Sequence, residues 1–169
     1  RYQADLGRKG FHTDAGQKRA VERFQALYEE LLSGQSGQPL WARLLGWRPA
    51  VVQGIYLYGG PGRGKTYLMD CFFDSLPFME KRRVHFHRFM LGLDEALDAL
   101  PATPGPLQMV AGKLAARYRV LCLDEFHVTD VADAMLLSGL LEVLLNKRVT
   151  IVATSNIKPD ALYKDGLQR

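Results

Sequence analysis

The feature that most constrains the fold is a glycine-rich run at residues 59–66, which reads Gly-Gly-Pro-Gly-Arg-Gly-Lys-Thr and directly follows the apolar residues 55–58. It fits the Walker A pattern, G-x-x-x-x-G-K-[ST]. This pattern holds phosphate only where a strand ends and a helix begins, because backbone N–H groups and the helix N-terminus then converge on the phosphate oxygens. Apolar residues recur after Thr66 and predict that helix. A phosphate-binding strand, loop and helix are therefore expected here, rather than a chance glycine-rich turn.

Within this loop the glycines are expected to let the backbone wrap closely around phosphate, whereas two side chains carry the chemistry. Lys65 would place a point charge at the β and γ phosphates, and the Thr66 hydroxyl would help to hold Mg²⁺. Pro61 fixes one φ angle and should not impair phosphate binding. The predicted nucleotide-binding residues of the loop are Gly59, Gly60, Pro61, Gly62, Arg63, Gly64, Lys65 and Thr66.

Length and composition describe an ordinary globular chain, since 169 residues with 47% hydrophobic and 24% charged residues suit one domain with a buried core. The net charge of +4 permits an acidic partner but does not identify nucleic acid, because a bound polyphosphate accounts for part of it. Cys71 and Cys122 lack metal-binding spacing and are expected to be reduced, buried, apolar residues. No apolar run reaches the about 18 residues of a membrane span. A soluble, reducing compartment is predicted. The sequence begins without Met, which is what a trimmed piece of a longer protein would show.

Hydrophobic spacing predicts strands that alternate with helices. Residues 13–17 carry a capping pattern, and apolar residues at helical spacing then continue to about Ser33, which predicts an amphipathic helix. The predicted strands are 53–58, 83–87, 120–123 and 149–154, and the later predicted helices are one that stops by residue 77, then 89–100, 107–118 and 131–146. This alternation favours an α/β fold, with a parallel sheet flanked by helices.

A polar stretch at residues 33–39, rich in Gly, Ser and Gln and ending in Pro, separates the first predicted helix from the first strand. Such a composition is typical of a linker or an exposed loop. We therefore expect residues 1–40 to form an N-terminal helical extension with its linker, and residues 41–169 to form the nucleotide-binding core.

An acidic pair, Asp124 and Glu125, follows the apolar strand predicted at 120–123. Relative to the loop at 59–66 this is the Walker B position, so Asp124 is expected to bind nucleotide and to lie beside the Mg²⁺ site. Glu125 could accept a proton from the water that attacks the γ-phosphate, a role that a kinase need not fill. The alternative is an acidic helix cap after a buried strand. The upstream Walker A loop favours the first interpretation, and the pair favours hydrolysis.

Two further polar residues come after the last predicted strand. Asn156 could hydrogen-bond the attacking water or the γ-phosphate, the role called sensor 1, although a strand-terminal Asn is also a common turn residue. Arg169 follows at the end of the chain, where oligomeric ATPases often present an arginine finger to a neighbouring subunit. A solvated terminal arginine is the alternative. Glu125, Asn156 and Arg169 are the predicted catalytic residues.

Histidines and a basic run remain outside these motifs. His85 and His87 alternate on the strand predicted at 83–87, but no third ligand has suitable spacing, so a solvent-facing pair is favoured over a metal site. His127 could relay changes from the nucleotide site. The basic residues at 81–83, with Arg88 and aromatic neighbours, resemble some single-strand nucleic-acid sites, yet a solvated turn is the more common explanation.

The order of these motifs resembles that of the AAA+ ATPases, and the intervening residues resemble one family among them. The phrases His-Phe-His-Arg-Phe-Met at 85–90, Asp-Glu-Phe at 124–126, Ala-Thr-Ser-Asn at 153–156 and Gly-Leu-Gln-Arg at 166–169 look like those of the bacterial ZapE family and its mitochondrial relatives. The resemblance covers nearly the whole chain. It implies a P-loop NTPase core of the AAA+ type, and Lys65, Thr66, Asp124, Glu125 and Asn156 match the nucleotide-site motifs of the family.

The resemblance also implies Mg²⁺-dependent ATP hydrolysis coupled to remodelling of a protein partner. In bacteria that partner would be the division-ring tubulin FtsZ, in the cytoplasm at the inner face of the membrane. A homo-oligomer is implied for the full-length protein. The chain stops at Arg169, before the fifth strand and the helical lid of an AAA+ module. We therefore expect this fragment alone to bind or hydrolyse ATP less well than a chain that includes the lid.

Two other functions are compatible with a nucleotide-binding core, one that uses the same motor and one that is not a motor. A helicase-loader-like ATPase would act on single-stranded nucleic acid, and its binding would depend on salt and on the basic residues near Arg82. A nucleotide switch would need no water-activating carboxylate, so Glu125 argues against it. Nucleic-acid binding is accordingly the less favoured prediction.

Overall fold

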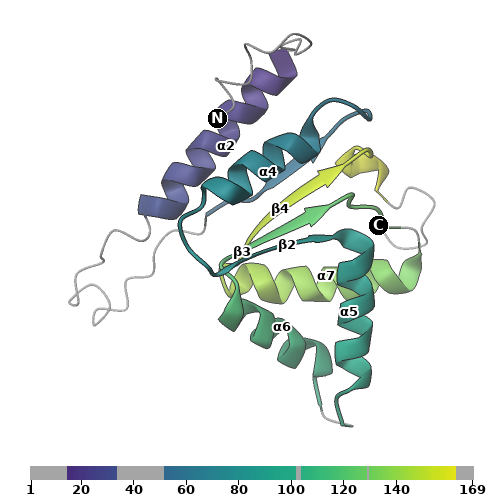
Figure 1. Ribbon diagram of the computed structural model, residues 1–169. Coiled ribbons are helices and arrows are strands. Elements are labelled where there is room, and N and C mark those ends of the chain that lie inside the picture. The colour runs from purple at the N-terminus through teal and green to yellow at the C-terminus, as the bar shows by residue number, and fades with distance from the viewer. Residues whose placement is uncertain (1–14, 34–51, 102–103, 129, 163–169) are drawn as a thin grey trace.

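The computed structural model describes residues 15–33, 52–101, 104–128 and 130–162. Its centre is a parallel sheet of four strands in the order β1-β4-β3-β2 (Figure 1). The strands are β1 (Ile55–Tyr58), β2 (Lys81–His85), β3 (Val120–Asp124) and β4 (Thr150–Ser155). All four run in the same direction, so their carboxyl ends lie along one edge of the sheet. The predicted parallel α/β fold is confirmed.

Helices cover both faces of this sheet (Figure 1). On one face lie α2 (Ala15–Ser33) and α4 (Lys65–Ser75); on the other lie α5 (Phe86–Asp98), α6 (Pro106–Arg117) and α7 (Val131–Asn146), and a short helix, η1 (Pro159–Ala161), follows β4. The helices predicted at 107–118 and 131–146 are confirmed. Asp130 caps α7 as predicted, since its carboxylate accepts a hydrogen bond from the Asp133 N–H at 2.8 Å.

Strand β3 shows how the two faces share the core. Its five residues are all buried, as expected for a central strand of a parallel sheet covered on both sides. Val120 and Cys122 pack with α2 and α4, whereas Leu121 and Leu123 pack with α5, α6 and α7. Burial raises the pKa of the Cys122 thiol to about 12, so this cysteine is an inert core residue, as the sequence predicted.

The prediction for the second strand was wrong by two residues. It placed the strand at 83–87, but β2 spans Lys81–His85, and α5 begins at Phe86. The register explains the difference, because Lys81 pairs with Val120 and His85 with Asp124, so β2 ends level with β3. His85 and His87 therefore do not alternate on one strand, and the basic run at 81–83 is a strand rather than a solvated turn.

The first described helix, α2, belongs to the same core as the Walker A helix. Phe24, Leu27 and Leu31 are buried against α4, and the rings of Phe24 and Phe72 lie 5.1 Å apart between centroids. The capping residues predicted at 13 and 14, and the proposed domain boundary near residue 40, lie outside the described residues. None of the helices in the described ranges combines the length and the apolar character that crossing a bilayer requires.

Candidate nucleotide-binding site

The sheet order brings the predicted site residues together at the carboxyl ends of three adjacent strands. The loop at 59–64 follows β1, Asp124 and Glu125 stand at the end of β3, and Asn156 follows β4, which lies between β1 and β3. Ligands of open parallel sheets bind at this edge. The loop is tied directly to β4, because the Gly59 N–H donates to the Ser155 carbonyl at 3.2 Å.

Glycine is required in the Walker A loop at two points of its path. Gly62 and Gly64 have φ angles of 75° and 72°, in the left-handed region that other residues seldom adopt. Gly64 is also the residue before α4, and its carbonyl accepts the Leu68 N–H at 2.9 Å to begin the helix. The loop thus places the N-terminus of α4 at the carboxyl edge of the sheet. The first N–H groups of a helix have no acceptor within the helix, so they are available to a ligand there.

The Lys65 ammonium is held by three acceptors inside this loop. It donates to the Gly59 carbonyl at 2.7 Å, to the Gly60 carbonyl at 2.8 Å and to Asn156 Oδ1 at 2.9 Å. Burial, aided by the nearby charge of Arg63, lowers its pKa although Asp124 opposes the shift. Lys65 and Asn156, predicted separately from two motifs, are therefore in direct contact.

A cavity of about 460 Å³ opens beside these groups. This volume lies within the roughly 300–1,000 Å³ that is usual for small-molecule sites. The cavity is lined by Pro61, Gly62, Arg63, Gly64, Lys65, Thr66, Tyr67, Glu125, Thr154, Ser155 and Asn156. It therefore gathers most of the predicted loop residues together with two of the three predicted catalytic residues.

Asp124 lies behind the cavity wall and is almost completely buried. Its Oδ2 accepts a hydrogen bond from Arg83 Nη2 at 2.8 Å, and its Oδ1 accepts one from the Thr154 hydroxyl. Arg83 also forms an ion pair with Asp70 of α4. Burial alone would raise the pKa of Asp124, but the hydrogen bonds from Thr154 and Arg83 and the charges of Arg83 and His85 lower it overall.

Glu125 is the most exposed acidic group of the site. Its side chain is 77% exposed, and its Oε2 lies 3.8 Å from His85 Nδ1. Its backbone has a φ angle of 56°, uncommon for a residue with a side chain, and its N–H donates to Thr154 Oγ1 at 3.2 Å. The strained backbone turns the carboxylate away from the core toward the cavity that it lines.

Sequence reasoning missed the residues that fix this turn. In the sequence, Thr154 and Ser155 were interpreted only as the end of the strand before Asn156. In the structure, both residues form hydrogen bonds that hold the Walker B segment against β4. The Phe126 N–H donates to the Thr154 carbonyl, and the Ser155 hydroxyl donates to the Phe126 carbonyl, both at 2.7 Å. A small hydroxyl residue at the buried end of a strand was the signal that could have identified them.

Two other contacts were not foreseen. Gln17 was taken as part of a helix cap, but its Nε2 donates to the Arg63 carbonyl at 3.1 Å, which joins α2 to the Walker A loop. In the sequence, Arg83 was grouped with a basic surface run. In the structure its guanidinium forms ion pairs with Asp70 and Asp124. Lys81, from the same basic run, also bonds within the fold: its ammonium donates to the Phe73 and Leu76 carbonyls at 2.6 and 2.8 Å.

The remaining candidates lie away from the cavity or outside the description. His85 does not line the cavity but lies beside Glu125, which does, and His87 and His127 are exposed. Arg169, predicted as an arginine finger, lies outside the described residues. In the parts of the chain that the structure describes, no three His, Cys, Asp or Glu side chains are grouped as a metal site of their own.

We expect Arg83→Gln to destabilise the fold by about 1–3 kcal/mol, the usual cost of leaving a buried acceptor without its hydrogen-bond donor. The folded-state pKa of Asp124 lies below its ordinary 3.8. Its ionisation therefore contributes stability that is present above that pH and is lost as the pH falls through the folded-state pKa. Without Arg83 that pKa rises, so the acid transition moves to higher pH. Thermal melts followed by circular dichroism from pH 3 to 7 measure both effects.

Arg88→Gln is the matched control for this variant, because Arg88 is an exposed arginine near Arg83 and faces solvent on α5. It should leave both the melting temperature at neutral pH and the acid transition unchanged. Equal melting curves for Arg83→Gln and the wild type would show that the pair with Asp124 contributes nothing to the fold.

The residues around the cavity fit a nucleoside triphosphate with Mg²⁺. Cationic groups, helix-terminal N–H donors and the Thr66 hydroxyl converge on one cavity of suitable volume. Asp124 retains acceptor capacity, since Arg83 and Thr154 each donate to one of its carboxylate oxygens and each oxygen has about two lone pairs. A glycine-rich loop links a parallel strand, β1, to a helix, and an acidic residue ends β3, which is separated from β1 by β4. This arrangement defines a P-loop nucleotide-binding protein of the AAA+ fold class.

Comparison with known proteins identifies the family within that class. The sequence profile of the AFG1-like ATPases matches residues 1–169, and the chain belongs to this family. The chain is 44% identical over 179 aligned residues to the cell division protein ZapE of Escherichia coli. The alignment covers 99% of this chain and 48% of that protein. The chain thus spans about half the length of these curated relatives.

Solved structures support the same fold. AMPPCP-bound DnaA from Aquifex aeolicus superimposes with a TM-score of 0.63 at 16% identity, over 90% of this chain and 42% of that one. The DnaC helicase loader superimposes with a TM-score of 0.60 at 17% identity, over 89% and 76% respectively. At these identities the likeness concerns the fold alone.

Proposed function

We propose that this chain contains the ATP-hydrolysing centre of an AAA+ motor and that it binds ATP with Mg²⁺. The observation that carries the proposal is the meeting of Lys65, Glu125 and Asn156 around one cavity, from three different segments of the chain. Membership of the AFG1-like ATPase family supports it. We further propose residues 41–169 as the nucleotide-binding core and residues 1–40 as its helical extension.

Lys65 would exchange its present acceptors for phosphate oxygens. Its ammonium now donates to two loop carbonyls and to Asn156, and it can reach the β and γ phosphates in their place. The N–H groups of the loop and of the first turn of α4 would bind the same phosphates. The Thr66 hydroxyl and the Asp124 carboxylate would hold Mg²⁺, which neutralises charge on the phosphates when bound.

Glu125 would act as the base for the attacking water. The water oxygen forms a bond to the γ-phosphorus while the bond from that phosphorus to the bridging oxygen breaks, and the water proton passes to the Glu125 carboxylate. ADP and inorganic phosphate leave. Asn156, whose Oδ1 now accepts from Lys65, would be released by that exchange, and its amide N–H groups would donate to the γ-phosphate or to the water. Arg169 is proposed as a finger that acts across a homo-oligomer.

We propose, finally, that ATP turnover remodels a protein partner in bacterial cell division, and that the partner is FtsZ in the cytoplasm. The support is the 44% identity to a relative named as a cell division protein. A measurement of ATP turnover with and without polymerised FtsZ tests this step. We expect a several-fold increase in rate with polymer, in line with a partner-coupled motor. A rate that polymer does not change would contradict FtsZ as partner and leave ATP hydrolysis standing.

A further inference from the structure

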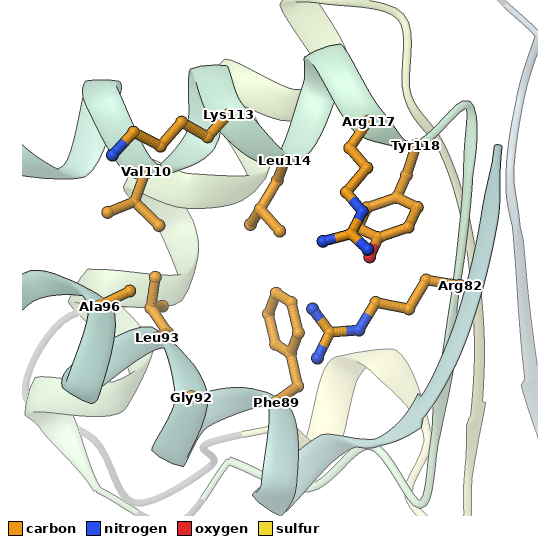
Figure 2. A pocket seen from close by; sticks show the side chains of 10 residues that line it. All are labelled: Arg82, Phe89, Gly92, Leu93, Ala96, Val110, Lys113, Leu114, Arg117 and Tyr118. Carbon is orange, nitrogen blue, oxygen red and sulfur yellow. The ribbon is translucent and has the colours of Figure 1, made fainter.

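A second cavity lies on the far side of the sheet from α4, between α5 and α6, and belongs to none of the nucleotide-site motifs. Its volume is about 240 Å³. Its walls are mainly apolar or aromatic and its other side chains are all cationic (Figure 2). We call it the α5/α6 groove; its principal residues are Arg82, Phe89, Leu93, Leu114, Arg117 and Tyr118.

Two arginines lie at one end of this groove, and no acidic side chain of the described ranges pairs with them. The guanidinium carbons of Arg82 and Arg117 lie 5.8 and 5.3 Å from the centre of the same ring, that of Tyr118. Figure 2 shows both guanidinium groups on the same side of the pocket, that of Arg82 beside the Phe89 ring and that of Arg117 beside Tyr118. Among the described residues neither arginine forms an ion pair, and neither does Lys113 of the same groove. Like charges brought together in this way favour a bound anion.

The dimensions of the groove indicate what kind of anion it accepts. A volume of about 240 Å³ is below the roughly 300–1,000 Å³ of sites that enclose a whole small molecule. It suits one large apolar side chain, with the rest of the ligand outside. The apolar walls, formed by residues such as Leu93, Val110 and Leu114, offer nothing to a phosphate or a sugar.

We propose that the α5/α6 groove binds a short acidic segment of a protein partner. One aromatic or branched apolar side chain of that segment enters the cavity, and the flanking carboxylates pair with Arg82 and Arg117. Arginine suits this role because its planar fork matches a carboxylate. This proposal rests on the proposed function in one respect: the acidic segment is taken to be part of the protein on which the motor acts.

An NMR titration of the full chain, without nucleotide, tests the groove directly. The probe is the acetylated and amidated peptide Glu-Asp-Phe-Asp-Glu. We expect saturable shifts of amide resonances in α5 and α6, and binding that weakens as salt is raised, because the paired charges are near the surface. The peptide with Gly in place of Phe, and the peptide Lys-Arg-Phe-Arg-Lys, should each bind about tenfold more weakly or not at all.

Gly92→Leu blocks the cavity without removing a charge. Gly92 lines the groove on α5, and a Cβ there meets open space, so a leucine can fill the cavity while strengthening the helix. We expect this variant to fold and to lose the peptide. Gly112→Leu on α6 is the matched control, since a Cβ there meets only the end of Lys147 and the residue does not line the groove. It should bind as the wild type does.

The contribution of charge to peptide binding is tested with the double variant Arg82→Gln and Arg117→Gln. The control is Arg88→Gln, because Arg88 is exposed and lies outside the groove. The double variant should bind about tenfold more weakly or worse, and the control should not change. Absence of saturable shifts at millimolar peptide, equal binding by Gly92→Leu, or displacement of the peptide by an oligothymidylate would overturn the proposal. Because ATP is absent, a negative result is distinct from failure of ATP hydrolysis, which turnover measures separately.

Discussion

Replacement of Lys65 by alanine is expected to weaken ATP binding by about 100-fold and to abolish turnover. The ammonium now uses all three donors on the Gly59, Gly60 and Asn156 oxygens, at 2.7 to 2.9 Å. Phosphate oxygens would take their place, and charge-assisted hydrogen bonds contribute about 1.5–3 kcal/mol, where about 2.7 kcal/mol corresponds to a factor of 100. Titration with a fluorescent ATP analogue measures the loss of affinity.

The melting temperature separates a binding defect from a folding defect. Wild-type protein should melt at a higher temperature with saturating ATP and Mg²⁺, because a ligand that binds only the folded state stabilises it. Lys65→Ala should lose that increase while it stays folded without ATP. Lys147→Ala removes an exposed lysine at the end of α7 and should retain the full increase. If Lys65→Ala bound ATP as tightly as the wild type, the cavity beside the Walker A loop would not be the nucleotide site.

Replacement of Glu125 by glutamine is expected to lower the rate of ATP hydrolysis by about 10²–10⁴ and to leave ATP affinity nearly unchanged. The amide keeps the size of the side chain but cannot take the proton of the attacking water, and loss of a general base typically costs that factor. The Glu125 side chain is 77% exposed, and no donor among the residues that the structure describes bonds to its carboxylate, so the fold should not suffer. Single-turnover release of phosphate measures the chemical step, and equilibrium titration measures affinity.

Glu142→Gln on α7 is the control for this variant, since Glu142 is exposed and distant from the three strand ends. It should hydrolyse ATP at the wild-type rate. Unimpaired hydrolysis in Glu125→Gln would remove Glu125 from the mechanism and require another base. Loss of ATP affinity together with turnover would instead mean that Glu125 holds the nucleotide rather than the water.

The parts of the site that sequence predicted are those whose signal is local. Glycines at fixed spacing, Lys65 and Thr66 lie within eight residues, and Asp124 with Glu125 directly follows an apolar strand. Each pattern specifies its own backbone geometry, so no knowledge of the sheet order was needed. The contact between Lys65 and Asn156, 91 residues apart, depends on β1 lying beside β4. The order of the motifs placed Asn156 near the γ-phosphate but did not predict its contact with Lys65.

The roles of Arg83 and Gln17 could not be predicted, because both depend on how distant elements align. Arg83 reaches Asp124 only because β2 pairs with β3 in the register that sets His85 opposite Asp124. In the sequence, alternation continued through residues 83–87, which hid the change from strand to helix at Phe86. Gln17 contacts the Walker A loop only because α2 packs on α4. Hydrophobic periodicity contains no information about either alignment.

The register of β2 has a mechanical consequence. Arg82 and Arg83 are consecutive on this strand, so their side chains leave it on opposite faces, one toward the α5/α6 groove and the other toward Asp124. Within the described sheet, β2 is an outer strand that pairs with β3 alone, so it can shift at the cost of one ladder of hydrogen bonds. A single peptide unit therefore joins the arginine of the α5/α6 groove to the arginine that pairs with the Walker B carboxylate, and a shift of β2 would move both together.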